Sequence, residues 1–186
     1  LIIGTNENNI LDRTLKTGEH TIKDVISTSS PSIDIQISSN FERLIYDACK
    51  DASTVSELMT NLKNKKSYTL PTKMREYIQS YFSSDTATKK EVEETISNYF
   101  NTYKVTLDPH TAVGIACGKK QKQPEEILVT LSTAHPAKFK ETVSKIISDE
   151  SFVTEKVRSL DKLEEHMIIA NNSSSEIKKL IDEQVA

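Results

Sequence analysis

The chain has 186 residues, with 24 Lys and Arg against 27 Asp and Glu; its net charge is therefore −3, and its length suits one domain or slightly more. No basic excess is present to bind a nucleic-acid backbone, and no apolar run approaches the roughly 18–20 residues that span a membrane. The spacing of the four glycines excludes a phosphate loop and a dinucleotide-binding motif. Cys49 and Cys117 have no CxxC partners, which excludes a zinc ribbon and indicates a reduced, cytoplasmic protein.

The chain opens with a short apolar run. Leu1–Thr5 predicts a buried strand, and apolar residues at helical spacing from Ile10 to Leu15 predict a helix that ends at Gly18. A strand, a polar turn and a helix in this order are typical of an α/β fold. Because the first residues already form the predicted strand and no Met precedes them, we expect the C-terminal part of a longer polypeptide. A mature processed form is the alternative, and the composition does not separate the two.

The region from about residue 45 to 105 is predicted to be a helical insertion. Two segments have the form of a capping box, Ser39 followed by Glu42 and Thr88 followed by Glu91, and each predicts a helix start. Before this region, residues 20–37 are expected to be extended and irregular. The other expected elements are a helix starting near residue 39, helices over 53–65, 73–82 and 88–103, and a short strand over 68–70.

The last part of the chain predicts two more helix starts and one strand. Asp108 and Pro109 suit the N-cap and the first residue of a helix, and Ile127–Leu131 is apolar enough for a second buried strand. Another helix is expected after His135, and a final short one from about Ser174. We therefore expect an α/β domain over residues 1–148, which includes the insertion, and a helical tail over 149–186.

Polar residues follow both of the predicted apolar strands. Ligands of open α/β sheets bind outside the carboxyl ends of the strands, so these residues are candidates for a site. They are Thr5, Asn6 and Asn8 after the first strand, and Ser132, Thr133 and His135 after the second. Free N–H groups at the helix starts near 38–40 and 108–111 also suit anionic ligands. A Ser or Thr at a strand end is commonly a cap or turn residue, so a structural role stays open.

The other reactive side chains carry weaker signals. His20, His110, His135 and His166 show no metal-ligand spacing, so we expect no metal site. No Ser or Cys lies in a nucleophile-elbow sequence. Lys138, one turn into a predicted helix, is expected to be a solvated surface lysine.

Four segments, in order along the chain, carry a resemblance to threonine synthases. They are TNENN at 5–9, PSIDI at 31–35 with SSNFER at 38–43, DPHTAVG at 108–114 and TAHPAKF at 133–139. Four motifs in the right order are far more specific than any one of them, and they cover roughly residues 1–145. The resemblance implies the C-terminal part of a fold-type II pyridoxal-phosphate (PLP) enzyme, of the tryptophan synthase β-like group. That fold is α/β, and here it would be helix-rich with a few buried parallel strands.

The resemblance also implies an activity. Threonine synthases use PLP to convert O-phospho-L-homoserine and water to L-threonine and phosphate. Two motifs of the family do not occur in this chain: the segment with the Schiff-base lysine, and the glycine-rich loop that holds the cofactor phosphate. The resemblance therefore implies that this chain has no catalytic residue of its own, is inactive alone, and has the N-terminal part of the same enzyme as its partner, without a nucleic acid or a membrane.

For the cofactor, the resemblance implies that the Thr133 hydroxyl meets the pyridine nitrogen, with Ser132 as its neighbour. A neutral hydroxyl cannot protonate the ring as a carboxyl group would, which is consistent with weaker electron withdrawal. Asp108 and His110 are implied to line or support the same pocket.

For the substrate phosphate, the candidate contacts are Ser38, Ser39, Asn40 and Arg43. A helix N-terminus presents free N–H groups, and a guanidinium binds phosphate in a fork, so both features suit this ligand. A structural ion pair is an equally good interpretation of Arg43.

Two alternatives stay open at this point. Another fold-type II lyase, such as a threonine dehydratase-like enzyme, shares the fold, but the SSNFER and DPHT segments fit the synthase pattern. A non-catalytic binding module derived from the enzyme is favoured if the gene begins near Leu1. A longer reading frame with the lysine and glycine-loop motifs removes that second alternative.

Overall fold

The computed structural model describes residues 1–160 and 162–185. It divides into two compact units, Leu1–Val153 and Thr154–Ala186, whereas the sequence predicts a boundary after residue 148. The larger unit contains all of the strands and all of the candidate site residues. Its strands and many helices agree with the predicted helix-rich α/β class.

The larger unit contains a parallel pair of strands, β1 (Ile2–Thr5) and β4 (Ser83–Thr86), with Gly4 opposite Asp85. The strand predicted at the start of the chain is confirmed. No strand is predicted at β4, because the sequence SSDT has neither an apolar run nor alternating hydrophobicity.

Side-chain hydrogen bonds explain how so polar a strand is held. Ser84 Oγ and Thr86 Oγ1 donate to the buried Asp12 carboxylate at 2.8 and 3.1 Å. Asp12 lies on helix α1 (Ile10–Thr17), which packs beside both strands. The Asp12 carboxylate therefore joins the helix to the strand pair. The same hydroxyls that make the β4 sequence resemble a loop hold this strand in place.

A second, antiparallel pair consists of β2 (Glu19–Thr21) and β3 (Ser67–Thr69), with His20 opposite Tyr68. The two rings stack with their centroids 4.6 Å apart. The strand expected over 68–70 is confirmed with a shift of one residue. β2 lies at the start of a segment that the sequence predicts to be irregular.

Three amphipathic helices pack around this hairpin: α2 (Phe41–Cys49), α3 (Ala52–Lys65) and α4 (Thr72–Tyr81). All three helices are confirmed within a few residues of the predicted bounds. Their apolar faces meet in one core that includes Leu15, Phe41, Ile45, Leu58, Leu62, Tyr68, Met74 and Ile78.

The two predicted capping boxes have different outcomes. At α5 (Lys89–Tyr103), Thr88 Oγ1 accepts the Glu91 N–H, and the Glu91 carboxylate accepts the Thr88 N–H, as predicted. The prediction at Ser39 is wrong: α2 has Asn40 as its N-cap, without a side-chain cap hydrogen bond. Asn40 already has helical backbone angles, and the Phe41 N–H donates to the Ser38 carbonyl oxygen at 3.1 Å, so the start of this helix is bonded to the backbone and not to the Ser39 side chain.

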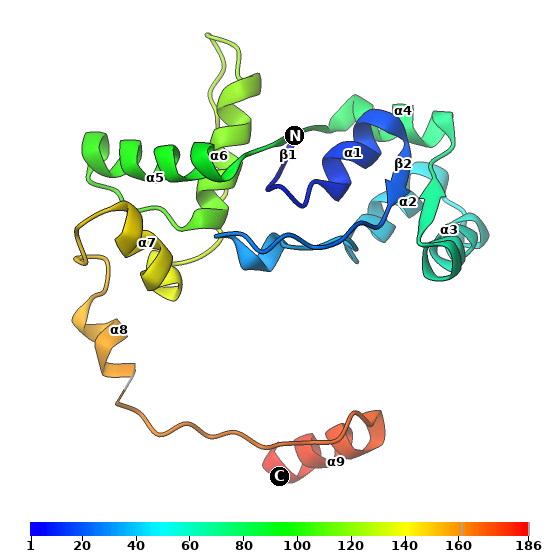
Figure 1. Ribbon diagram of the computed structural model, residues 1–186. Helices are drawn as coiled ribbons and strands as arrows, with labels where there is room; N and C mark the ends of the chain where they lie inside the picture. The colour runs from blue at the N-terminus through cyan, green and yellow to red at the C-terminus, as the bar shows by residue number, and fades with distance from the viewer. Residues whose placement is uncertain (161, 186) are drawn as a thin grey trace. The chain divides into compact units, whose positions relative to one another are not determined.

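Helix α6 (Pro109–Gln121) packs against both α5 and β1 (Figure 1). Its start at Asp108 and Pro109 is confirmed. Glycines allow the close approach to β1: a Cβ added to Gly4 would lie 3.3 Å from the Cα of Gly114.

The strand predicted at 127–131 is wrong. The segment has no strand hydrogen bonding, and Ile127, Val129 and Leu131 are 91%, 79% and 80% exposed. The alternate side chains, Leu128 and Thr130, lie over glycines of α6. A strand needs a hydrogen-bonding neighbour, and this segment has none among the residues that the structure describes.

Short helices complete the larger unit: η1 (Pro31–Ile33), η2 (Pro136–Phe139) and α7 (Lys140–Ile146), which packs on α5. The helix expected after His135 is thereby confirmed, with a 3-10 turn at its start.

The smaller unit contains α8 (Glu155–Leu160) and α9 (Ser174–Val185). The final helix starts at Ser174 as predicted. Throughout 1–160 and 162–185, no helix is both long enough and apolar enough to cross a membrane.

Candidate functional site

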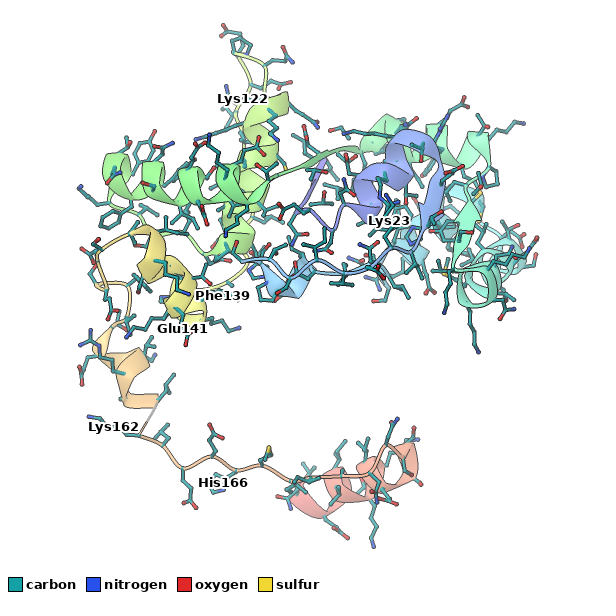
Figure 2. All side chains as sticks on the ribbon, viewed as in Figure 1. Lys23, Lys122, Phe139, Glu141, Lys162 and His166 are labelled. Carbon is teal, nitrogen blue, oxygen red and sulfur yellow. The ribbon has the colours of Figure 1, made fainter. Side chains whose placement is uncertain are left out.

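A cleft of about 860 Å³ runs along α6 in the larger unit. Phe139 and Lys122, both of which line it, lie near opposite ends of that helix (Figure 2). Its walls are mainly apolar, from β1 and the 127–131 segment, and His110, Thr133 and Lys138 supply polar groups. Three of the four resemblance segments, 31–35, 108–114 and 133–139, contribute residues to this one cleft.

The first turn of α6 is organised by the Asp108 carboxylate, which is only 1% exposed. Its Oδ1 accepts the backbone N–H groups of His110 at 2.9 Å and Thr111 at 3.4 Å. Its Oδ2 accepts the Thr111 hydroxyl. Asp108 is therefore an N-cap whose acceptors are satisfied from within the helix, and it supports the cleft from behind.

His110 connects this helix start to the 31–33 turn. The backbone N–H of Ser32 donates to His110 Nε2 at 3.1 Å, so Nε2 is an acceptor and the ring proton lies on Nδ1. Nδ1 in turn donates to Asp108 Oδ1 at 3.0 Å. The Phe139 ring packs on the imidazole with a centroid distance of 4.7 Å. His110 thus lines the cleft as a fixed, neutral ring with both nitrogens engaged.

Thr133 reaches the same helix start through Thr111. The Thr133 N–H donates to Thr111 Oγ1 at 3.1 Å, and the two hydroxyl oxygens lie 3.3 Å apart. Thr133 is exposed and lines the cleft. Thr111 is buried, and no role for it follows from the sequence pattern. The one signal is its place directly after His110 in the DPHT motif.

The neighbours of Thr133 differ in position. Ser132 is exposed and does not line the cleft. His135 caps the following turn, its Nδ1 accepting the Ala137 N–H at 3.2 Å. Lys138 is exposed, as predicted, but it also lines the cleft.

The candidate phosphate contacts Ser38, Ser39, Asn40 and Arg43 lie at the start of α2 and do not line this cleft. Ser38 Oγ donates to Asn40 Oδ1 at 2.5 Å, and Arg43 is exposed. Within the described ranges, no ion pair engages the Arg43 guanidinium. The structure therefore gives no support to the alternative interpretation of Arg43 as a structural ion pair.

The polar residues after β1 are committed to the fold. Asn6 Nδ2 donates to Asp34 Oδ1 at 2.6 Å, and Asn8 Nδ2 donates to the same oxygen at 3.0 Å. Thr5 Oγ1 donates to the carbonyl oxygen of Asp85 at 3.0 Å. The two asparagine bonds tie the β1–α1 turn to the 26–34 loop and so position the loop that carries Ser32. The Thr5 bond instead ties β1 to β4.

Cys117, behind the cleft on α6, is a packing residue. Its side chain is buried, and burial raises the pKa of the thiol to about 11, so it stays protonated and weakly nucleophilic near neutral pH. Over 1–160 and 162–185, no group of three or more His, Cys, Asp or Glu side chains could hold a metal ion.

Comparisons with known proteins point to threonine synthases. A family model described as "Threonine synthase, C-terminal" matches residues 111–181. The threonine synthases of Eremothecium gossypii and Saccharomyces cerevisiae are each 32% identical to this chain, and each alignment covers 100% of the chain and 41% of the relative. The chain therefore spans about two fifths of the length of the curated relatives it matches.

Solved structures give the same result. A PLP-bound threonine synthase from Brucella melitensis matches with a TM-score of 0.84 and 37% identity, over 100% of this chain and 39% of that one. The yeast threonine synthase matches with a TM-score of 0.82 and 31% identity, over 100% and 42%. The fold is thus that of the C-terminal part of a fold-type II PLP enzyme. Within that class, the chain matches the C-terminal portion of threonine synthases.

Proposed function

We propose that the chain serves as the C-terminal part of a threonine synthase, which converts O-phospho-L-homoserine and water to L-threonine and phosphate. The observation that carries the proposal is the convergence of three motif segments, far apart in the sequence, on one cleft. The Ser32–His110 and Thr133–Thr111 hydrogen bonds join these segments to one another.

The residues present suit one end of PLP. A flat heteroaromatic ring needs apolar walls and a polar partner for its nitrogen, and the cleft offers both, with the Thr133 hydroxyl as that partner. Ser132 is its neighbour in the chain. PLP, when bound, supplies an electron sink for carbanions, and the protein supplies placement and proton transfer. The chain has no glycine-rich loop for the cofactor phosphate, so that end belongs to another part of the enzyme.

Within the cleft, the residues of this chain hold one another in place. His110 is held by bonds at both nitrogens and keeps the 31–33 turn against α6. Asp108 fixes the first turn of that helix. The Phe139 ring packs on the His110 imidazole at that end of the cleft. The ring proton of His110 therefore has a defined direction, toward Asp108.

Recognition of the substrate phosphate is assigned to Ser38, Ser39, Asn40 and Arg43. The support is an exposed guanidinium beside a helix start, a combination that binds phosphate well. Because these residues do not line the α6 cleft, the role requires the substrate to extend toward α2.

The N-terminal part of the same enzyme is the proposed macromolecular partner. Ile127, Val129 and Leu131 present an apolar row that is 79–91% exposed. Their backbone pairs with no strand in the described part of the chain. Covering such a row by a neighbouring strand would bury apolar surface and satisfy the open backbone groups. We also place the enzyme in the cytoplasm, in keeping with two cysteines that are both free.

An assay with the full-length polypeptide that carries this segment tests the proposal. With PLP and O-phospho-L-homoserine, it should release phosphate and L-threonine in equal amounts, and the 186-residue chain alone should release neither. A full-length protein that instead forms 2-oxobutanoate and ammonia from threonine would be a dehydratase. A protein inactive on both substrates would support a non-catalytic module. Either result would overturn the assignment.

A further inference from the structure

A row of three side chains leads from the interior of the larger unit to the cleft. Asp108 is 1% exposed and Thr111 is 5% exposed, whereas Thr133 is exposed. The Asp108 carboxylate accepts the Thr111 hydroxyl, and Thr111 Oγ1 lies next to both the nitrogen and the hydroxyl of Thr133. The position of the exposed residue is thus set by a buried pair.

The direction of these hydrogen bonds follows from the number of protons. A threonine hydroxyl has one proton, and that of Thr111 is given to Asp108 Oδ2. Thr111 Oγ1 can therefore only accept from Thr133, and it takes the Thr133 N–H at 3.1 Å. The longer contact between the hydroxyl oxygens, at 3.3 Å, leaves the Thr133 hydroxyl proton free to turn toward a ligand.

Nothing else of this kind holds Thr133 in place. The segment from 122 to 133 lies outside any helix or strand, and in the described part of the chain both hydrogen bonds of Thr133 end on Thr111. Thr111, by contrast, lies in the first turn of a 13-residue helix and is locked by the N-cap. The rigid helix α6 therefore positions Thr133, which lies in an irregular segment.

We propose that Thr111 is a positioning residue that holds the Thr133 hydroxyl at the ring nitrogen of the cofactor, with Asp108 fixing Thr111 in turn. The inference rests on the proposed function, because it needs PLP in the cleft. It adds a residue that contacts neither substrate nor cofactor and acts only through Thr133. A carboxylate fully engaged by helix donors makes the arrangement rigid before the cofactor arrives.

The test uses the full-length enzyme that carries this segment. Thr111→Val keeps the shape and removes the oxygen, and Thr111→Ser keeps the oxygen. Thr133→Val removes the hydroxyl that faces the ring. The matched control is Thr95→Val on α5, which removes a buried hydroxyl bonded only to the Glu91 carbonyl of its own helix. For each variant, PLP affinity is measured by absorbance titration, and apoenzyme stability by thermal unfolding.

Thr111→Val should weaken PLP binding by about tenfold, the effect of one lost hydrogen bond, and should shift the cofactor absorption band in the same direction as Thr133→Val. Thr111→Ser should keep the PLP affinity and the absorption band of the wild type. Thr95→Val should change neither, whatever it does to thermal stability. The double variant Thr111→Val/Thr133→Val should bind PLP no more weakly than Thr133→Val alone, because both remove the same contact.

Normal PLP affinity and absorption in Thr111→Val, with an altered Thr133→Val, would overturn the positioning role and leave the proposed function standing. If the losses of PLP affinity in the two single variants multiply in the double variant, the positioning role is likewise overturned. A wild-type enzyme that does not bind PLP would overturn the proposed function itself. If Thr111→Val fails to fold, Thr111→Ala provides the same comparison with a better helix former.

Discussion

The backbone N–H of Ser32 and Nε2 of His110, which are 78 residues apart in the sequence, are joined by a 3.1 Å hydrogen bond. This contact connects two of the segments that resemble threonine synthases and brings both to one cleft. It also fixes the tautomer of the imidazole, whose Nδ1–H then serves Asp108. One neutral histidine therefore organises the turn, the helix cap and the wall of the cleft together.

Replacing this histidine should destabilise the larger unit. His110→Phe keeps an aromatic ring against Phe139 but removes both nitrogens, so the Ser32 N–H and Asp108 Oδ1 each lose a partner. We expect the free energy of unfolding to fall by about 2 kcal/mol, for two hydrogen bonds at about 1 kcal/mol each. Urea unfolding measures this, with His166→Phe as an exposed control. A loss as small as that of the control would contradict the linking role.

The two sequences of capping-box form provide a matched pair. Thr88→Ala removes a side chain that accepts the Glu91 N–H, and should cost about 1 kcal/mol of unfolding free energy. Ser39→Ala removes a side chain that caps nothing, and should change the stability by less than about 0.5 kcal/mol. Chemical denaturation of both variants decides the matter, and equal losses would refute the assignment of Asn40 as the N-cap.

His20 should make the stability depend on pH. Its ring is 2% exposed, and burial lowers its pKa from 6.5 to about 4, assisted by the charge of Arg13 and opposed by the backbone of Gln36. The unfolded chain takes up the proton near pH 6.5 and the folded chain only near pH 4. Stability is therefore complete above about pH 6.5 and falls as the pH drops from there toward 4, by about 3 kcal/mol at most.

Unfolding in urea at several pH values measures that dependence. His20→Phe keeps the ring stacked on Tyr68 and removes the titrating group, so its stability should fall less steeply between pH 6.5 and 4. His166→Gln serves as the control and should keep the wild-type slope. An unchanged slope in His20→Phe would mean that other groups cause the acid sensitivity.

Arg43 tests the proposed contact with the substrate phosphate. In the full-length enzyme, Arg43→Ala should raise KM for O-phospho-L-homoserine about tenfold or more, the effect of a lost charged hydrogen bond. Arg43→Lys should recover part of this, and Lys63→Ala, an exposed cation on α3, should leave KM unchanged. Steady-state kinetics measures all three. An unaltered KM in Arg43→Ala would remove this residue from the site.

The helices could be predicted from the sequence because their information is local. Thr88 and Asp108 cap the helices that their positions predict, and apolar residues at helical spacing mark α2 to α5. The prediction of a capping box at Ser39 is wrong because capping depends on backbone angles, which a four-residue motif does not specify. The strands depend on partners. The sequence does not predict β4, because its hydroxyls bond to the distant Asp12. Ile127–Leu131 has the composition of a strand, but it has no strand to pair with over residues 1–160 and 162–185.

The candidate site shows the same division. Motifs indicated His110 and Thr133 separately, and the fold places both on one cleft. Thr111 could not be assigned a role from the sequence, because its contact with Thr133 crosses 22 residues and its buried proton is committed to Asp108. Asn6 and Asn8 suggested a ligand site by position alone, whereas their amides are occupied by Asp34.

Mapping of the cofactor-bearing lysine is the most direct test of the account. The full-length polypeptide is loaded with PLP, reduced with borohydride, digested and analysed by mass spectrometry, beside the 186-residue chain treated in the same way. We expect one stoichiometric adduct on a lysine outside residues 1–186, and no stoichiometric adduct in the chain alone. A stoichiometric adduct on Lys138, or on any other lysine of this segment, would contradict the account.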